Sequence, residues 1–92
     1  MVKPYSDRWL NDNTRIRRFD SNISSNELVW HQDTKTRRVT VLEGIGWKLQ
    51  LDNQLPVELL PDTSYTIPQE MHHRLLKGAG ELIVEIKEET NQ

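Results

Sequence analysis

Apolar residues recur at every second position in several short stretches, and this alternation constrains the fold more than any other feature of the sequence. In residues 47–52, Trp47, Leu49 and Leu51 alternate with polar side chains, and residues 82–87 carry a similar pattern. Successive side chains of a β-strand point to opposite faces, so the pattern is typical of strands with one buried face. No stretch repeats its apolar positions at helical spacing. The sequence therefore predicts an all-β protein.

Short turn signals divide the chain into segments of strand length. Asp, Asn, Pro and Gly residues, which favour turns, gather at residues 52–54, 61–63 and 77–80. Strands are expected over residues 15–19, 27–31, 37–42, 47–51, 55–60, 64–67, 73–76 and 82–86. This spacing favours an antiparallel barrel or sandwich. We expect an N-terminal arm over residues 1–14, packed by its aromatic rings, and a single β-barrel domain over 15–92.

Length, charge and composition limit the kinds of partner and the cellular locations that the sequence predicts. The 92 residues are enough for one domain, and a net charge of −2 provides no basic field, so we expect no nucleic-acid partner. The basic run at residues 15–18 is interpreted as a charged strand edge that discourages edge-to-edge pairing, with phosphate contact as the alternative. The absence of cysteine excludes disulfides and fits a cytoplasmic location. No apolar run has the length of a membrane span or of a signal-peptide core.

Two histidines and one aspartate form the candidate metal site. His31 and Asp33 alternate on one expected strand, so their side chains face the same way, and His73 lies on another. Two imidazoles and one carboxylate suit a divalent ion such as iron, manganese or zinc, and they leave coordination positions open. His72 is expected to point to the opposite face from His73 because the two are neighbours on one strand.

Residues 27–88 resemble the cupin superfamily, whose small jelly-roll barrels carry two sequence motifs. The first motif has two histidines two residues apart, a glutamate four residues later and an apolar strand ending in Val-Leu-Glu-Gly. Here its positions hold His31, Asp33 and Arg37, followed by the Val-Leu-Glu-Gly of residues 41–44. The second motif, Pro-x-Gly-x-x-His, corresponds to residues 68–73 and ends in His73. The middle of the chain is also similar to small cupin-like proteins of large tailed bacteriophages.

The resemblance implies a cupin-like antiparallel jelly-roll barrel and, because cupins commonly pair, a homodimer. It also implies a divalent metal (Fe, Mn, Zn or Ni), with His31 and His73 carried over by identity as ligands. Three departures from the motifs bear on this site. Asp33 stands where the motif has its second histidine, and its carboxylate can still be a ligand. Arg37 occupies the glutamate position, and a guanidinium has no lone pair to offer a metal. Glu70 replaces the glycine of the second motif, which leaves the geometry of that turn open.

Three further residues are candidates for contact with a ligand. The cupin register turns Arg37 inward, where it would either clamp the carboxylate or phosphate of a small anionic molecule or form an ion pair with Asp33. Trp47 and Tyr65 would either line the cavity and stack on a ring of the ligand or belong to the core.

Three classes of function stay open at this point. The first is a metal-dependent enzyme acting on a small molecule, with Arg37 holding an anionic group of the substrate. The second is a non-catalytic cupin that binds a ligand or a protein, with an Asp33–Arg37 pair in place of the metal. The third is a homodimeric accessory protein. The sequence contains no nucleophile paired with a base and no phosphate-binding loop, so no catalytic residue is assigned.

Overall fold

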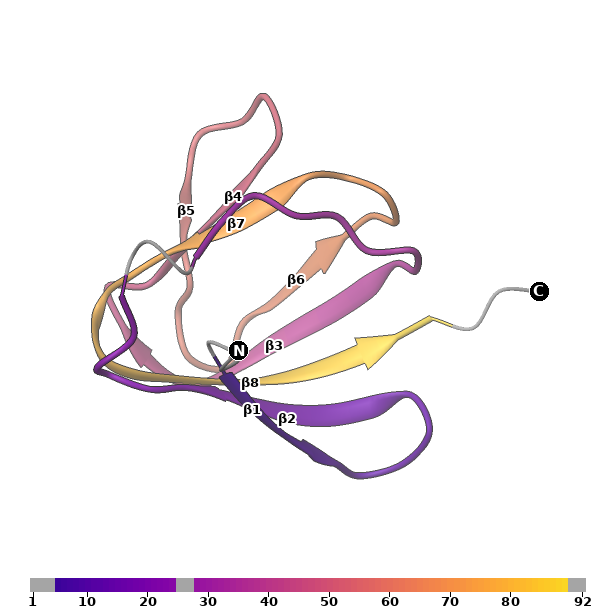
Figure 1. The fold of residues 1–92 in the computed structure, drawn as a ribbon, viewed down its shortest axis with the longest axis horizontal. Helices are drawn as coiled ribbons and strands as arrows, with labels where there is room; N and C mark the ends of the chain where they lie inside the picture. Colours follow the sequence, from indigo (N-terminus) through magenta and orange to yellow (C-terminus); the bar gives the residue numbers. More distant parts are fainter. Residues whose placement is uncertain (1–4, 25–27, 90–92) are drawn as a thin grey trace.

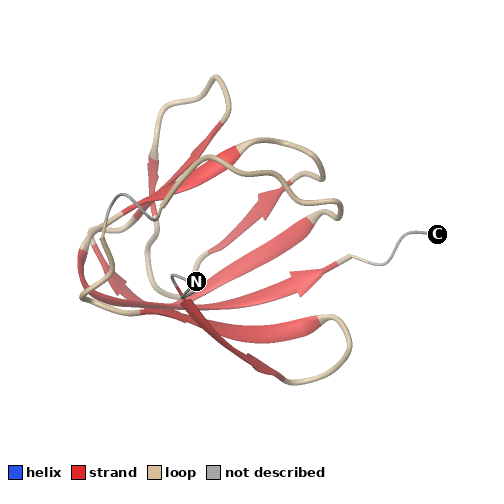
Figure 2. Cartoon of the chain, in the orientation of Figure 1, coloured by secondary structure: helices blue, strands red, loops and turns tan. Residues whose placement is uncertain are grey.

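The computed structural model describes residues 5–24 and 28–89, and every regular element in these two ranges is a β-strand (Figures 1 and 2). The strands are β1 (Tyr5–Trp9), β2 (Thr14–Phe19), β3 (Arg37–Ile45), β4 (Lys48–Leu51), β5 (Val57–Glu58), β6 (Ser64–Ile67), β7 (His73–Leu76) and β8 (Ala79–Glu88). The all-β prediction is confirmed. The described residues contain no helix that could cross a membrane.

The strands form two antiparallel sheets. The larger sheet has the order β1-β2-β8-β3-β6, and the smaller one has the order β5-β4-β7. In Figure 1 the smaller sheet lies across from the larger one, with the long strands β3 and β8 on the opposite side of the molecule's interior. The two sheets do not join into one closed barrel, so the expected barrel is an open jelly roll.

The core lies between the sheets and is made by alternate residues of the strands. Residues 39 and 41 of β3 face it together with residues 82, 84 and 86 of β8. The buried apolar side chains are Phe19, Ile23, Val39, Val41, Trp47, Leu49, Leu59, Ile67, Leu82, Val84 and Ile86. Burial of each large aliphatic side chain stabilises the fold by about 1.5–3 kcal/mol relative to exposure. The prediction that alternate apolar residues form the buried face of a strand is therefore confirmed for residues 47 and 49 and for residues 82, 84 and 86.

Two expected strands differ from the structure. Of residues 27–31, position 27 lies outside the described residues, 28–30 have no strand geometry, and His31 makes only an isolated bridge with His73. Residues 55–60 contain only the two-residue strand β5. Apolar residues alone do not make a strand, because a strand also needs a partner backbone to accept and donate its hydrogen bonds.

The N-terminal segment pairs with the larger sheet. Residues 5–9 of the expected arm form β1, which pairs antiparallel with β2, and the ring of Tyr5 packs edge-on against Phe19 at 5.6 Å between centroids. Strand β2 consequently lies between β1 and β8 and is not an edge strand. The interpretation of residues 15–18 as a protective strand edge is wrong, because Arg15 and Arg17 point inward beside Phe19 and are buried.

Glu70, at the position of the motif glycine, adopts the backbone conformation that glycine favours. Its φ angle is 61°, in the left-handed region that costs an L-residue about 1–2 kcal/mol. Its backbone N–H donates a hydrogen bond to the carbonyl oxygen of Asp33 at 2.6 Å. The turn geometry of the motif is therefore kept without its glycine, and the turn holds the segment that carries Asp33.

Replacing Glu70 with glycine is expected to raise the free energy of unfolding by about 0.5–1 kcal/mol, because glycine removes the steric cost of the positive φ. Thermal unfolding would show this as a rise of a few degrees in Tm. The matched control is Gln69→Gly at the neighbouring residue, which does not have a positive φ and should lose stability. A Glu70→Gly protein less stable than the wild type would contradict this account of the turn.

Candidate metal centre and cavity

A two-residue backbone bridge brings the two candidate histidines together. The N–H of His31 donates to the carbonyl of His73 at 3.0 Å, and the N–H of His73 donates to the carbonyl of His31 at 2.8 Å. Directly opposed residues of an antiparallel pair place their side chains on the same face. The two imidazole rings therefore meet edge to face, with centroids 4.1 Å apart and an interplanar angle of 62°.

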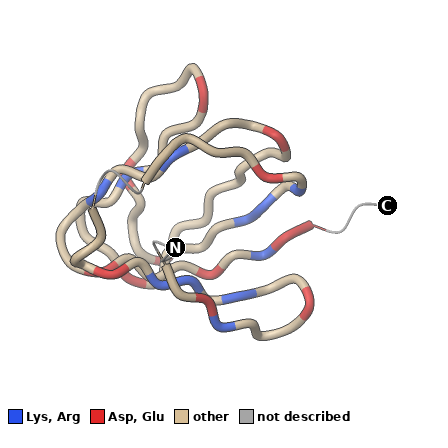
Figure 3. The backbone as a smooth tube through the Cα atoms, in the orientation of Figure 1, with Lys and Arg blue, Asp and Glu red and all other residues tan. Residues whose placement is uncertain are grey.

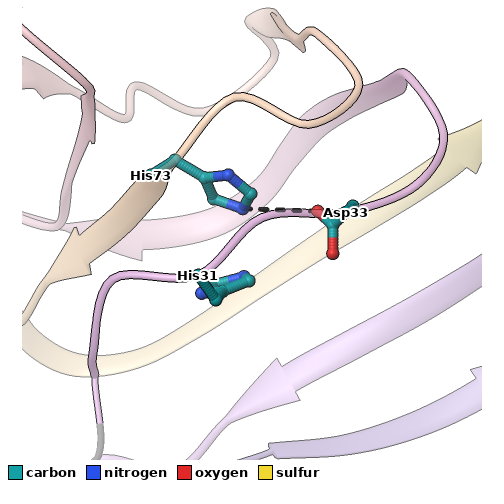
Figure 4. Close-up of side chains that lie close together, drawn as sticks. All are labelled: His31, Asp33 and His73. Carbon is teal, nitrogen blue, oxygen red and sulfur yellow. Dashed lines mark ion pairs between the residues drawn. The ribbon is translucent and has the colours of Figure 1, made fainter.

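Asp33 completes the group from two residues farther along the chain (Figure 4). Its Oδ2 lies 3.4 Å from Nε2 of His73, and one potential ligand atom from each of the three residues lies within 4.8 Å of the other two. His73 is buried, Asp33 is half-buried and His31 is exposed, so the group sits where the interior meets solvent. The structure thus brings together His31, Asp33 and His73, as the sequence predicted.

Backbone carbonyls select the tautomer of each neutral imidazole ring. Nδ1 of His31 lies 3.1 Å from the carbonyl oxygen of Val29, and Nδ1 of His73 lies 3.0 Å from that of Met71. A carbonyl oxygen can only accept, so in each neutral ring Nδ1 carries the hydrogen and Nε2 keeps a lone pair. This is the outer hydrogen bond that metal-binding histidines commonly make. The Nε2 atoms are the ones left to act as ligands.

Nε2 of His73 and Oδ2 of Asp33 lie close together, and both are acceptors when the His73 ring is neutral. Burial lowers the pKa of His73, and the nearby His31 and Arg37 lower it further, outweighing the Met71 carbonyl and Asp33. His73 is therefore neutral at pH 7, and its Nε2 lone pair points at a carboxylate oxygen. Among the described residues, this buried Oδ2 of Asp33 accepts no well-aligned hydrogen bond, although Nη1 of Arg37 lies 3.2 Å away as an ion-pair partner. A divalent cation suits this donor set of two imidazole nitrogens and one carboxylate oxygen.

Arg37 points inward and pairs with two carboxylates. Its Nη1 lies 3.2 Å from Oδ2 of Asp33, while its Nε and Nη2 each lie 3.1 Å from Oε2 of Glu88. The neighbouring Arg38 is exposed, so the inward orientation predicted for Arg37 is confirmed. The Asp33–Arg37 ion pair that the sequence analysis gave as one of two alternatives is present. Arg37 thus stands at the motif's glutamate position in the sequence, and its guanidinium lies beside Asp33 of the metal group.

The ion pairs continue from Arg37 to the β1–β2 hairpin. Oε1 of Glu88 lies 3.5 Å from Nη1 of Arg15. On its other side, Nε of Arg15 lies 3.5 Å from Oδ2 of Asp7. Arg17 donates to both oxygens of Asp7 at 2.8 and 2.9 Å. We call Asp33, Arg37, Glu88, Arg15, Asp7 and Arg17 the ionic chain. Figure 3 shows basic and acidic positions side by side on this hairpin.

The ionic chain is balanced in charge, with three arginines and three carboxylates. Burial alone would raise the pKa of Glu88, but the charges of Arg15 and Arg37 and their hydrogen bonds outweigh it and lower that pKa. Sequence reasoning missed Asp7, Arg15, Arg17 and Glu88 as parts of the site. A signal was present for two of these positions, because Arg17 alternates with Phe19, and Glu88 continues the inward-facing series of β8.

A cavity of about 330 Å³ opens between the sheets beside the metal group. Tyr5, Arg17, His31, Asp33, Arg37 and His73 supply its polar lining. The rest of the wall is made of Phe, Leu, Val and Ile side chains, among them the fully buried Leu59 and Leu82. The cavity therefore has one polar region and an otherwise apolar wall.

Trp47 and Tyr65 do not line this cavity. Trp47 is 0% exposed and packs against Phe19 at 6.0 Å between ring centroids, so it belongs to the core. The hydroxyl of Tyr65 donates to the carbonyl of Glu58 at 2.8 Å and accepts the N–H of Leu60 at 3.2 Å. Tyr65 thus holds the loop between β5 and β6. An aromatic residue on an expected strand can be a core ring or a ring that faces a cavity, and the sequence does not distinguish the two.

Comparison with known proteins identifies the fold. No protein-family model and no curated protein matches the sequence. Among solved structures, a cupin domain from Bordetella pertussis is 19% identical with a TM-score of 0.63, and the match covers 98% of this chain and 99% of that one. A cupin-2 domain containing protein from Shewanella frigidimarina is 19% identical with a TM-score of 0.66, covering 94% and 81%.

A putative mannose-6-phosphate isomerase from Ralstonia eutropha is 16% identical with a TM-score of 0.69, covering 94% of this chain and 83% of that one. Together these similarities show that the chain has the cupin fold, and this prediction is confirmed. Fold and site define a small cupin-fold protein with a His-Asp-His group that could hold a metal ion. The similarity to phage proteins, the homodimer, the cytoplasmic location and the absence of a nucleic-acid partner stay predictions.

Proposed function

We propose that this protein is a divalent-metal-binding cupin that holds a small anionic molecule in its cavity. The observation that carries the proposal is the arrangement of donor atoms. Both imidazoles turn Nδ1 toward a backbone carbonyl, and Nε2 of His73 lies 3.4 Å from Oδ2 of Asp33, a buried oxygen whose one close cationic neighbour among the described residues is Arg37 at 3.2 Å. A divalent cation bound to both of these atoms would remove the repulsion between their lone pairs.

In this proposal His31, Asp33 and His73 hold the metal, and the other residues of the site position them. Three protein ligands leave positions open, and a bound divalent ion supplies Lewis-acid polarisation of an oxygen atom on the small molecule. Arg37 and Glu88 hold Asp33 through the ionic chain. The backbone N–H of Glu70 holds the peptide of Asp33 from the other side.

The Asp33–Arg37 ion pair favours a second candidate function. With Arg37 Nη1 3.2 Å from the carboxylate, the arginine satisfies part of the charge that a metal would otherwise neutralise. The protein would then be a non-catalytic cupin that binds a ligand or a protein partner. Metal analysis separates the two candidates, because only the first requires a stoichiometric ion.

The wild-type protein is expected to bind about one equivalent of Zn²⁺, Ni²⁺, Mn²⁺ or Fe²⁺, and His73→Ala is expected to lose this binding because it removes the buried ligand. At a metal concentration about 100 times Kd, the bound ion should add about 2.7 kcal/mol to the free energy of unfolding. Isothermal titration calorimetry gives the stoichiometry, and thermal unfolding gives the stabilisation.

His72→Ala is the matched control for this experiment, since His72 is the exposed neighbour of His73 and its ring is not part of the metal group. We expect His72→Ala to bind the metal as the wild type does. A wild-type protein without stoichiometric metal after reconstitution would eliminate the metal proposal and leave the non-catalytic candidate.

A further inference from the structure

We infer that the molecule held in the cavity is an amphipathic carboxylate: one anionic oxygen head at the metal and an aliphatic body in the apolar interior. This inference rests on the proposed metal site and deepens it by naming the class of ligand. Three observations support it: the lining of the cavity, the charge at its polar region and its volume.

Most of the cavity lining is apolar, and the buried polar residues that it includes are His73 of the metal group and Arg17 of the ionic chain. The rim includes the exposed His31 and Val29, which is 60% exposed. The deep wall includes Leu49, Leu59 and Leu82, which are 4%, 2% and 0% exposed. Hydroxyl groups placed against such a wall would lose their hydrogen bonds to water without replacement. A sugar is therefore disfavoured there, and an aliphatic body gains from leaving water.

The charge of the polar region selects an anionic head. The ionic chain is neutral as a whole, since its three arginines match its three carboxylates. Histidines that bind a metal do so as neutral imidazoles, so His31 and His73 add no charge to the metal-loaded site. A divalent ion on the group would leave an excess of two positive charges beside an apolar space, where charges interact strongly. Arg37 is already engaged by Asp33 and Glu88, so the anionic head would meet the metal.

The volume limits the length of the ligand. A cavity of about 330 Å³ lies at the small end of the range of roughly 300–1,000 Å³ that is typical of ligand pockets. We therefore expect a small ligand, such as octanoate or decanoate, to fill it. The metal group lies at the solvent-facing end, so such a ligand would extend its chain inward from the metal.

A chain-length series tests the inference directly. Calorimetric titrations would use the Ni²⁺-loaded full-length protein with acetate, butyrate, hexanoate, octanoate, decanoate and dodecanoate, and with mannose 6-phosphate as a polar anion. We expect affinity to rise by about fourfold per methylene from butyrate to octanoate and to stop rising by dodecanoate. 1-Octanol, which has the chain but lacks the charge, should bind at least tenfold more weakly than octanoate.

A variant with a smaller cavity provides a second test of the amphipathic ligand. Leu75 is half-buried, lies two residues from His73 on β7 and lines the cavity. Leu75→Phe should weaken octanoate at least tenfold while leaving acetate unchanged, because it fills space that only the longer chain needs. The matched control is Leu76→Phe, the half-buried neighbour outside the cavity lining, which should bind the whole series like the wild type.

The outcomes separate this inference from the proposed metal function. Equal affinities from acetate to decanoate, or tighter binding of mannose 6-phosphate than of octanoate, would overturn the amphipathic ligand and leave the metal site standing. Failure of the protein to take up Ni²⁺ in the preceding titration would overturn both. The wild-type series decides the question even where Leu75→Phe lowers the yield of folded protein.

Discussion

Replacing Asp7 with alanine is expected to lower the free energy of unfolding by about 3 kcal/mol. Asp7 accepts two hydrogen bonds from Arg17 and lies 3.5 Å from Arg15, and the side chains of these arginines are only 9% and 4% exposed. A guanidinium stays protonated at any ordinary pH, so it cannot relieve the loss of its partner by neutralising itself. Chemical denaturation of the purified protein measures the change.

Glu81→Ala is the matched control for Asp7→Ala. Glu81 pairs with Arg18 of the same strand β2 at 3.1 Å, but these side chains are 36% and 58% exposed. Water and salt screen such a pair, so its loss should change the free energy of unfolding by no more than about 0.5 kcal/mol. Equal effects of Asp7→Ala and Glu81→Ala would show that the buried arginines do not depend on the ionic chain.

Replacing Arg37 with glutamate is expected to make the stability of the protein depend on metal. Without metal, the new carboxylate would face Asp33 and Glu88, whose side chains are 14% and 17% exposed, and the free energy of unfolding should fall by about 3 kcal/mol at pH 7. With metal, the same carboxylate supplies a fourth ligand and removes a competing positive charge. We therefore expect metal affinity to rise by at least about a hundredfold, or about 2.7 kcal/mol.

Thermal unfolding with and without Zn²⁺ measures this effect, and Arg38→Glu provides the control. Arg38 is the next residue of β3, but it is exposed on the opposite face, so the same change of charge there should leave the metal response as in the wild type. A Zn²⁺-induced rise in Tm that is no larger in Arg37→Glu than in Arg38→Glu would show that Arg37 does not occupy a ligand position.

The metal group was predictable from sequence although one premise was wrong. His31 and Asp33 were expected to share a face because they alternate on a strand, yet residues 28–30 form no strand and His31 makes a single bridge. That bridge still directs the side chains of His31 and His73 to one face, because opposed residues of an antiparallel pair point the same way. The spacing of the motif residues therefore predicted this group of side chains better than the expected strand did.

The charged residues of β1 and β2 show where sequence reasoning stops. The run at residues 15–18 has the composition of a solvated edge, and only the pairing of β1 with β2 makes β2 an inner strand. An arginine is buried where a carboxylate from another strand reaches it, as Asp7 and Glu88 reach Arg15. Such a partner lies many residues away, so local composition does not reveal it.

The sequence by itself determined the all-β class and the buried face of β8. These follow from local physics, because the alternation of side chains along a strand is fixed by its backbone. The motif spacing also predicted His31, Asp33 and His73 as a group, but a long-range backbone bridge brings the two histidines together. Only the tertiary structure decided that Arg37 bridges Asp33 and Glu88, that Trp47 fills the core, and that apolar side chains make up most of the cavity wall. Those outcomes depend on which strands pair and which faces meet, and these long-range contacts are not written in any short stretch of the chain.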